Sequence, residues 1–96
     1  MIGKTIEMRR LSDGAVYRFE AQPSGLDGLP RFKRADKDIW ILRDEKFGWI
    51  VWDAQDKALM GRPWEIAIED QGDLPPECDW VSRKGANSFV YRLVFV

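Results

Sequence analysis

The side chains in this sequence that could carry chemistry are carboxylates, guanidinium groups and indoles, because there is no histidine and only one cysteine, Cys78. Without histidine, the chain lacks the commonest general base and the commonest metal ligand. Cys78 lies between Glu77 and Asp79, and neighbouring carboxylates raise the pKa of a thiol. We therefore expect Cys78 to be a small, partly buried residue, and we predict no catalytic residue.

Metal binding is also disfavoured by the sequence. With one cysteine and no histidine, a transition-metal site would have to be built from carboxylates alone. Asp53 and Asp56 share one predicted turn, but their spacing does not match that of a calcium-binding loop. We predict no metal and no cofactor. An enzyme that uses a pair of carboxylates is a distant third hypothesis, because no spacing indicates such a pair.

Tryptophan is the residue type most suited to binding here, with five copies in 96 residues. A buried indole N–H needs a hydrogen-bond partner, so we expect some of the five at the edge of the core or on the surface. Flat aromatic faces beside charged residues suit the stacking of a sugar or another small ligand. The candidate binding residues are Trp40, Trp49, Trp52, Arg62, Trp64 and Trp80.

Trp64 is the strongest surface candidate in this set. The glycine and proline of segment 61–63 are expected to break regular structure and to take Trp64 out of a strand. Arg62 could stack on an aromatic ring beside it. The alternative is that Trp64 caps the end of the core.

The elements that must position these residues are short strands. The apolar runs 39–42 and 49–52 are rich in Ile, Val, Leu and Trp, and a charged segment ending in Gly48 separates them. Gly48 can adopt the positive φ that a hairpin turn requires. We predict a central hairpin here.

The register of this hairpin is open. One alignment places Trp40 on the same face as Trp49, and a shift by one residue places it with Trp52 instead. Both faces are apolar in either case. The pair is therefore either covered on both sides or keeps one face for a partner.

The rest of the chain alternates in the same way. Ile6, Met8 and Arg10 share one face of the first segment, and Tyr17 and Phe19 are expected to face the core in the second. Segment 65–71 is ambiguous between a strand and a short helix. The other predicted strands cover 4–11, 15–22, 31–35, 58–60, 79–82 and 88–96.

The strand at 88–96 ends the chain with apolar residues. Phe89, Tyr91, Leu93 and Phe95 form one of its faces. An apolar terminal strand invites aggregation unless it is paired. We expect it to be paired centrally or across a dimer.

These elements predict one domain, residues 1–96, that is mainly β. We expect an antiparallel meander forming a small sandwich or partly open barrel, with at most one short helix.

Several features occur together in chain order: Tyr17, 28–32, 39–41, 48–51 and 74–81. This order resembles a tryptophan-rich module found as tandem repeats in large proteins of marine algae and as single-domain bacterial proteins. The resemblance implies a compact β-meander of undefined function and brings no catalytic residues.

The charge of the chain limits the kinds of partner that it can bind. The net charge of −1 argues against nucleic-acid binding. Segment 65–79 carries six acidic residues and no basic ones, which suits either a basic partner or a solvated loop. A basic patch that would resemble a single-strand nucleic-acid platform is the less favoured alternative. Its residues would be Arg31, Lys33, Arg34, Arg83 and Lys84.

No signal peptide and no apolar run long enough to span a bilayer are seen, so we expect a cytoplasmic protein without membrane contact.

Our first functional hypothesis is a non-catalytic module that binds a protein partner, or a second copy of itself, through an apolar sheet face. The alternative is a small-ligand or carbohydrate binder that uses surface tryptophans.

Overall fold

The computed structural model describes residues 5–23, 28–84 and 86–96, and it contains eight antiparallel strands and one 3-10 turn. The strands are β1 (Thr5–Arg10), β2 (Val16–Gln22), β3 (Arg31–Arg34), β4 (Ile39–Asp44), β5 (Gly48–Asp53), β6 (Ala58–Pro63), β7 (Asp79–Lys84) and β8 (Asn87–Phe95). The 3-10 turn η1 (Ile68–Asp70) falls within the segment that the sequence left ambiguous.

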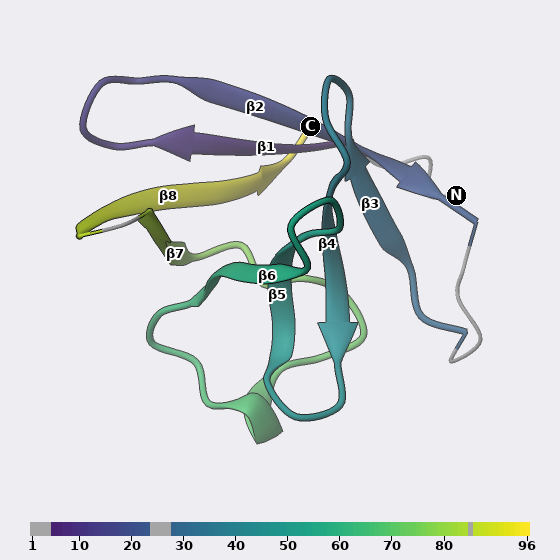
Figure 1. Ribbon diagram of the computed structural model, residues 1–96. Coiled ribbons are helices and arrows are strands. Elements are labelled where there is room, and N and C mark those ends of the chain that lie inside the picture. Colours follow the sequence, from purple (N-terminus) through teal and green to yellow (C-terminus); the bar gives the residue numbers. More distant parts are fainter. Residues whose placement is uncertain (1–4, 24–27, 85) are drawn as a thin grey trace.

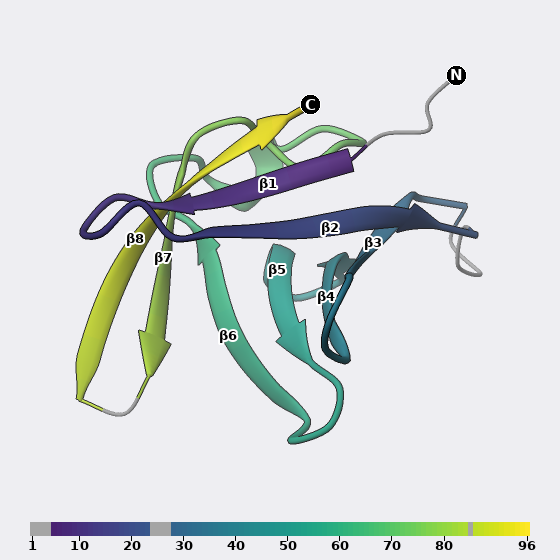
Figure 2. The same cartoon turned by 90° about the horizontal axis from the view of Figure 1, so that it is seen from above.

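Each strand pairs with its neighbours in the sequence, and β8 closes the circle by pairing with β1. Figures 1 and 2 show β1 beside both β2 and β8. The prediction of an antiparallel β-meander is confirmed, and the barrel is closed. The apolar strand β8 is paired on both sides, by β7 and β1, so neither of its edges is left exposed.

Side-chain alternation builds one core inside the barrel. On β1, Ile6 and Met8 are buried while Arg9 is exposed, and on β2 Phe19 is buried between two exposed residues. These are the inner faces that alternation predicts, because successive side chains of a strand point to opposite sides. The buried cluster comprises Ile6, Met8, Phe19, Phe32, Ile39, Ile41, Trp49, Val51, Trp80 and Leu93.

The register of the central hairpin is the one that places Trp40 opposite Trp52. The residues of the turn fix this register. The Asp44 carboxylate accepts hydrogen bonds from the backbone N–H groups of Lys46 and Phe47, at 2.8 and 3.0 Å. Gly48 then adopts a φ of +75°, as its position in the hairpin requires.

The predicted break at 61–63 is wrong, because β6 continues through these residues to Pro63. Gly61 is needed there for a close approach. A Cβ atom at this position would lie 2.8 Å from the backbone oxygen of Val81. Pro63 is tolerated as the last residue of the strand. β7 likewise extends to Lys84, beyond the predicted end at residue 82.

The two ends of the barrel differ. The connections after β1, β3 and β5 are short turns and lie at one end, because consecutive strands are antiparallel. The connection between β6 and β7 lies at the other end and spans residues 64–78 (Figure 1). We call the end with these short turns the open end, and the end that carries segment 64–78 the closed end.

The closed end is held by the two fully buried indoles. Trp49 Nε1 donates to the carbonyl of Gly72 at 2.9 Å, and Trp80 Nε1 donates to the carbonyl of Pro76 at 3.0 Å. Segment 64–78 therefore closes this end over the core. Among the described residues there is no helix long and apolar enough to cross a membrane.

Candidate functional site

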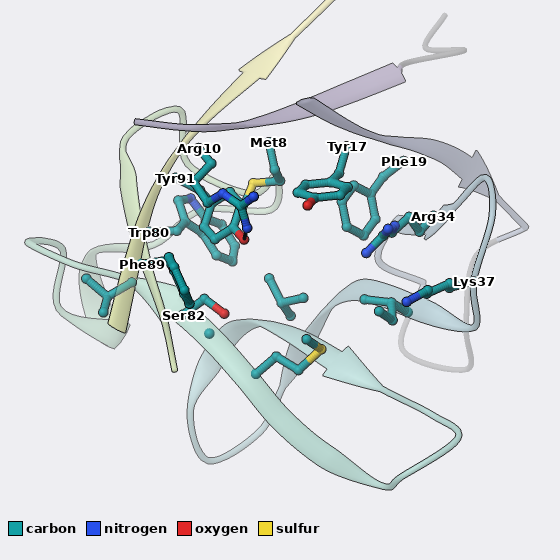
Figure 3. A pocket seen from close by; sticks show the side chains of 15 residues that line it. Met8, Arg10, Tyr17, Phe19, Arg34, Lys37, Trp80, Ser82, Phe89 and Tyr91 are labelled. Carbon is teal, nitrogen blue, oxygen red and sulfur yellow. Dashed lines mark hydrogen bonds between the residues drawn. The ribbon is translucent and has the colours of Figure 1, made fainter. Parts of the chain in front are cut away.

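A cavity of about 230 Å³ lies inside the open end of the barrel. Figure 3 shows that side chains from strands on several sides of the barrel point into it. Its lining residues are Met8, Arg10, Tyr17, Phe19, Arg34, Lys37, Ile39, Val51, Met60, Gly61, Trp80, Val81, Ser82, Phe89 and Tyr91.

The inner part of the cavity is apolar. Met8, Phe19, Ile39, Val51 and Trp80 all belong to the buried core and also line the cavity. They face inward because successive side chains of a strand point alternately into the barrel and away from it. The cavity is therefore the part of the barrel interior that the core side chains leave unfilled.

Polar side chains surround the outer part of the cavity. Arg10 and Arg34 are the last residues of β1 and β3, in phase with the buried Met8 and Phe32. Their inward direction follows from the same alternation that builds the core. At a strand end, a long side chain can keep its charged group near water while its stem covers apolar surface.

Tyr17 lies between the two arginines. The guanidinium carbon of Arg34 is 4.2 Å from the centre of the Tyr17 ring, and that of Arg10 is 5.8 Å from it. Such cation–π contacts hold both cations beside one aromatic ring. Arg10 Nη1 also donates to the hydroxyl of Tyr91 at 3.3 Å. Four strands, β1, β2, β3 and β8, thereby contribute to one polar cluster (Figure 3).

Each arginine is paired with a carboxylate of the turn that follows it. Arg10 donates to both Asp13 oxygens at 2.9 and 2.8 Å, and Arg34 donates to both Asp36 oxygens at 2.6 and 3.1 Å. The hydrogen bonds from Arg10 lower the pKa of Asp13 to about 2, and those from Arg34 also lower the pKa of Asp36. Hydrogen bonding to Asp13 and Tyr91 raises the pKa of Arg10.

Lys37 is the third cation of the cavity and comes from the turn between β3 and β4. Its ammonium group makes no ion pair with any carboxylate of the described residues. No Asp or Glu of that part of the chain lines the cavity. The lining is therefore positive, with its negative partners on the turns outside.

The six residues that the sequence singled out do not form one site. Trp49 and Trp80 are fully buried, and only Trp80 lines the cavity. Trp40 and Trp52 lie opposite each other on β4 and β5, on the outer face of the barrel, and both are half-buried. Trp40 Nε1 donates to Asp38 at 2.7 Å.

Trp64 is 64% exposed, as expected for a surface tryptophan. It borders a second hollow of about 270 Å³ on the outside of the barrel, together with Arg62 and Phe47. Arg62 stacks on Phe47, at 5.3 Å from the ring centre, and not on an indole. This hollow contains no residue of the cavity inside the barrel.

The five basic residues considered for a nucleic-acid patch do not gather on one face. Arg34 points into the barrel, whereas Lys33 is on the opposite face of the same strand. Arg83 lies on β7, which is four strands away from β3 in either direction around the barrel.

Sequence reasoning placed Tyr17 toward the core and considered Arg34 for a basic patch, but it assigned no residue to a cavity. The six polar residues of the cavity are Arg10, Tyr17, Arg34, Lys37, Ser82 and Tyr91. For most of them a signal was present, because a polar residue that continues an inward apolar face must point toward the core or its rim. Lys37 lies in a turn and carries no such signal.

Cys78 is half-buried, and burial raises the pKa of its thiol, which donates to the carbonyl of Asp79 at 3.5 Å. Within the described parts of the chain, no three metal-binding side chains are grouped together. No family model, no curated protein and no solved structure matches this chain. The resemblance to a tryptophan-rich module therefore stays a prediction.

Proposed function

We propose that this protein binds a small molecule inside the open end of its barrel. The observation that carries this proposal is the cavity itself, with its apolar inner part and its surrounding polar groups. Ligand sites in proteins combine these two features, because apolar walls supply affinity and a few polar groups fix the orientation. This proposal keeps the small-ligand hypothesis but changes the place of binding. The ligand lies inside the barrel and not on surface tryptophans.

The volume limits the ligand. At about 230 Å³, the cavity is smaller than the roughly 300–1,000 Å³ of pockets for drug-sized molecules. A compact molecule with one ring or a short branched chain fits this space better than a long acyl chain. Its polar end would lie among Arg10, Arg34 and Tyr17.

Binding is favoured over catalysis by the chemistry of the lining. The described lining residues include the hydroxyl groups of Ser82, Tyr17 and Tyr91, but no carboxylate or imidazole to act as a base. Arginine stays protonated at neutral pH and serves to hold an anion.

The proposal is tested by isothermal titration calorimetry with phenylpropionate and phenylpropanol. We expect at least one of these probes to show saturable binding. Ser82→Phe places an aromatic ring in the cavity, whereas Ser88→Phe places it on the exposed face of β8. Ser82→Phe should weaken binding by about tenfold or more, since the ligand and the new ring compete for the same volume. Equal affinity in both variants, or no binding of either probe, would overturn the proposal.

Self-association is a second candidate function, and a specific surface supports it. Leu11 is 58% exposed and Val90 is 38% exposed. The two residues are adjacent, because Leu11 N–H donates to the carbonyl of Val90 at 2.9 Å. Light scattering over a range of concentrations tests this candidate. A dimer in the wild type that dissociates in Leu11→Glu would support it, and a monomer at all concentrations would exclude it.

A further inference from the structure

We infer that the ligand of this cavity is a small monocarboxylate with an apolar body, a conclusion that rests on the binding function proposed above. The inference depends on three properties of the cavity: the sign of its charge, the number of charges without a partner, and the hydrogen-bond donors without a partner.

The sign of the charge comes from the lining. Arg10, Arg34 and Lys37 line the cavity, and no Asp or Glu within the described ranges does so. Lys37 is exposed and the two arginines are partly exposed, but the walls beside these cations are apolar, and low-dielectric walls focus the field of a charge in a cleft. An anion in the cavity is therefore favoured over a neutral molecule of the same shape.

The number of uncompensated charges indicates one negative charge on the ligand. Arg10 and Arg34 already have the carboxylates of Asp13 and Asp36 as partners. Lys37 is the lining cation that has no ion-pair partner among the described residues. A monoanion balances this one charge. A dianion such as a phosphate monoester would carry an excess negative charge beside Asp13 and Asp36.

The donors suit a carboxylate. Arg34 uses Nε and Nη2 toward Asp36 and leaves Nη1 without a partner in the described structure. Within the same part of the chain, the hydroxyl of Tyr17 and the ammonium group of Lys37 donate to no protein group either. Two carboxylate oxygens offer about four acceptor positions, enough for these three donors. Figure 3 shows Tyr17 and Arg34 next to each other and Lys37 beyond Arg34.

The apolar body would lie on the other side of the polar cluster. Met8, Phe19, Ile39 and Val51 supply aliphatic and aromatic surface there. A phenyl ring or a branched alkyl group of matching size would bury its surface against them. The ligand is thus placed with its carboxylate at the open end and its apolar body toward the core.

The test compares three probes of similar size on the whole chain by titration calorimetry: phenylpropionate, phenylpropanol and phenylethyl phosphate. Phenylpropionate should bind about tenfold more tightly than phenylpropanol, since hydrogen bonds to charged groups are stronger than those to neutral ones. The phosphate should bind no better than the carboxylate. Added salt should reduce the preference for the carboxylate over the alcohol.

Lys37→Met should reduce this preference several-fold while the affinity for the alcohol is kept. Lys46→Met is the matched control. It removes the same charge from the turn between β4 and β5, and Lys46 does not line the cavity. The control should keep the wild-type preference. If Lys37→Met and Lys46→Met reduced the preference for the carboxylate equally, only the net charge of the protein would matter. That result would overturn the inference.

The outcomes separate this inference from the proposed function. If the alcohol and the carboxylate bind equally well, the protein still binds small molecules in its barrel, but the monocarboxylate inference is wrong. If the phosphate binds far more tightly than the carboxylate, the ligand is a dianion and the inference is also wrong. If no probe binds, the proposed function and the inference both fail.

Discussion

Arg10 and Tyr91 lie opposite each other in the pairing of β1 with β8, and Arg10 Nη1 donates to the Tyr91 hydroxyl at 3.3 Å. This pairing joins the first and last strands and closes the barrel. Both side chains also line the cavity. The contact that helps to close the fold is therefore also part of the candidate binding site.

Replacing Arg10 with glutamine should weaken the binding of phenylpropionate by about tenfold. Without Arg10, the Asp13 carboxylate has no cation beside it and repels an anionic ligand. Calorimetry measures the change, and Arg9→Gln is the control because Arg9 points outward and pairs with Glu7. Equal affinity in the two variants would contradict the assigned role of Arg10.

The pKa of Asp13 should be near 2 in the folded protein, because Arg10 donates hydrogen bonds to both of its carboxylate oxygens. Carbon-detected NMR titration of the Asp13 carboxyl group measures this pKa. In Arg10→Gln it should rise toward the ordinary value of about 3.9. A pKa that is the same in both proteins would exclude the Arg10 pair as its cause.

This pKa shift has a consequence for stability. A carboxyl group with a lowered pKa in the folded state stabilises the fold above its unfolded pKa, and this contribution is lost as the pH falls. For Asp13 the loss should occur between about pH 4 and pH 2. Urea unfolding across this range should show a smaller decrease in stability in Asp13→Asn than in the wild type. An identical decrease would contradict the prediction.

Gly61→Ala should destabilise the barrel by about 1–3 kcal/mol, the usual cost of overpacking. The added Cβ would lie 2.8 Å from the Val81 backbone oxygen, so β6 or β7 must shift. Gly72→Ala is the control, because a Cβ there meets nothing within 4 Å. Thermal and urea unfolding compare the two variants. The close pairing of β6 with β7 would be refuted if Gly61→Ala were as stable as Gly72→Ala.

Gln71→Leu should lower the free energy of unfolding by about 1–3 kcal/mol, since it leaves a buried N–H unpaired. Gln71 Oε1 accepts from the backbone N–H of Trp49 at 2.8 Å, and Nε2 donates to the carbonyl of Ile66 at 3.3 Å. The bond from Trp49 attaches segment 64–78 to β5, whereas the bond to Ile66 holds the Gln71 side chain within that segment. Gln55→Leu, in the exposed turn after β5, should change stability little. A larger loss of stability in Gln55→Leu than in Gln71→Leu would exclude this role of Gln71.

The sequence predicted most of the strands because their signal is local. Alternation placed Tyr17 with Phe19 on the inner face of β2, and the charged turn before Gly48 marked the central hairpin. The break predicted at Gly61 failed for a long-range reason. Whether that glycine interrupts a strand or permits a close approach depends on Val81, which lies on a different strand.

The site was less predictable than the fold. Alternation grouped Arg10 with Ile6 and Met8, but it did not indicate that Tyr17 and Tyr91 would lie on either side of Arg10. That arrangement depends on barrel closure, which the sequence did not specify. The tryptophans drew attention by their number, yet Trp49 and Trp80 serve mainly to close the other end of the barrel.

The most direct test of the central claim is an NMR titration with phenylpropionate that follows side-chain methyl groups. We predict saturable shifts, and contacts to the probe ring, at the methyl groups of Met8, Met60, Ile39 and Val51, which line the cavity. The methyl groups of Ile66 and Ile68, beside Trp64, should not change. Shifts confined to Ile66 and Ile68, or no saturable shift at the cavity methyl groups, would contradict a binding site inside the barrel.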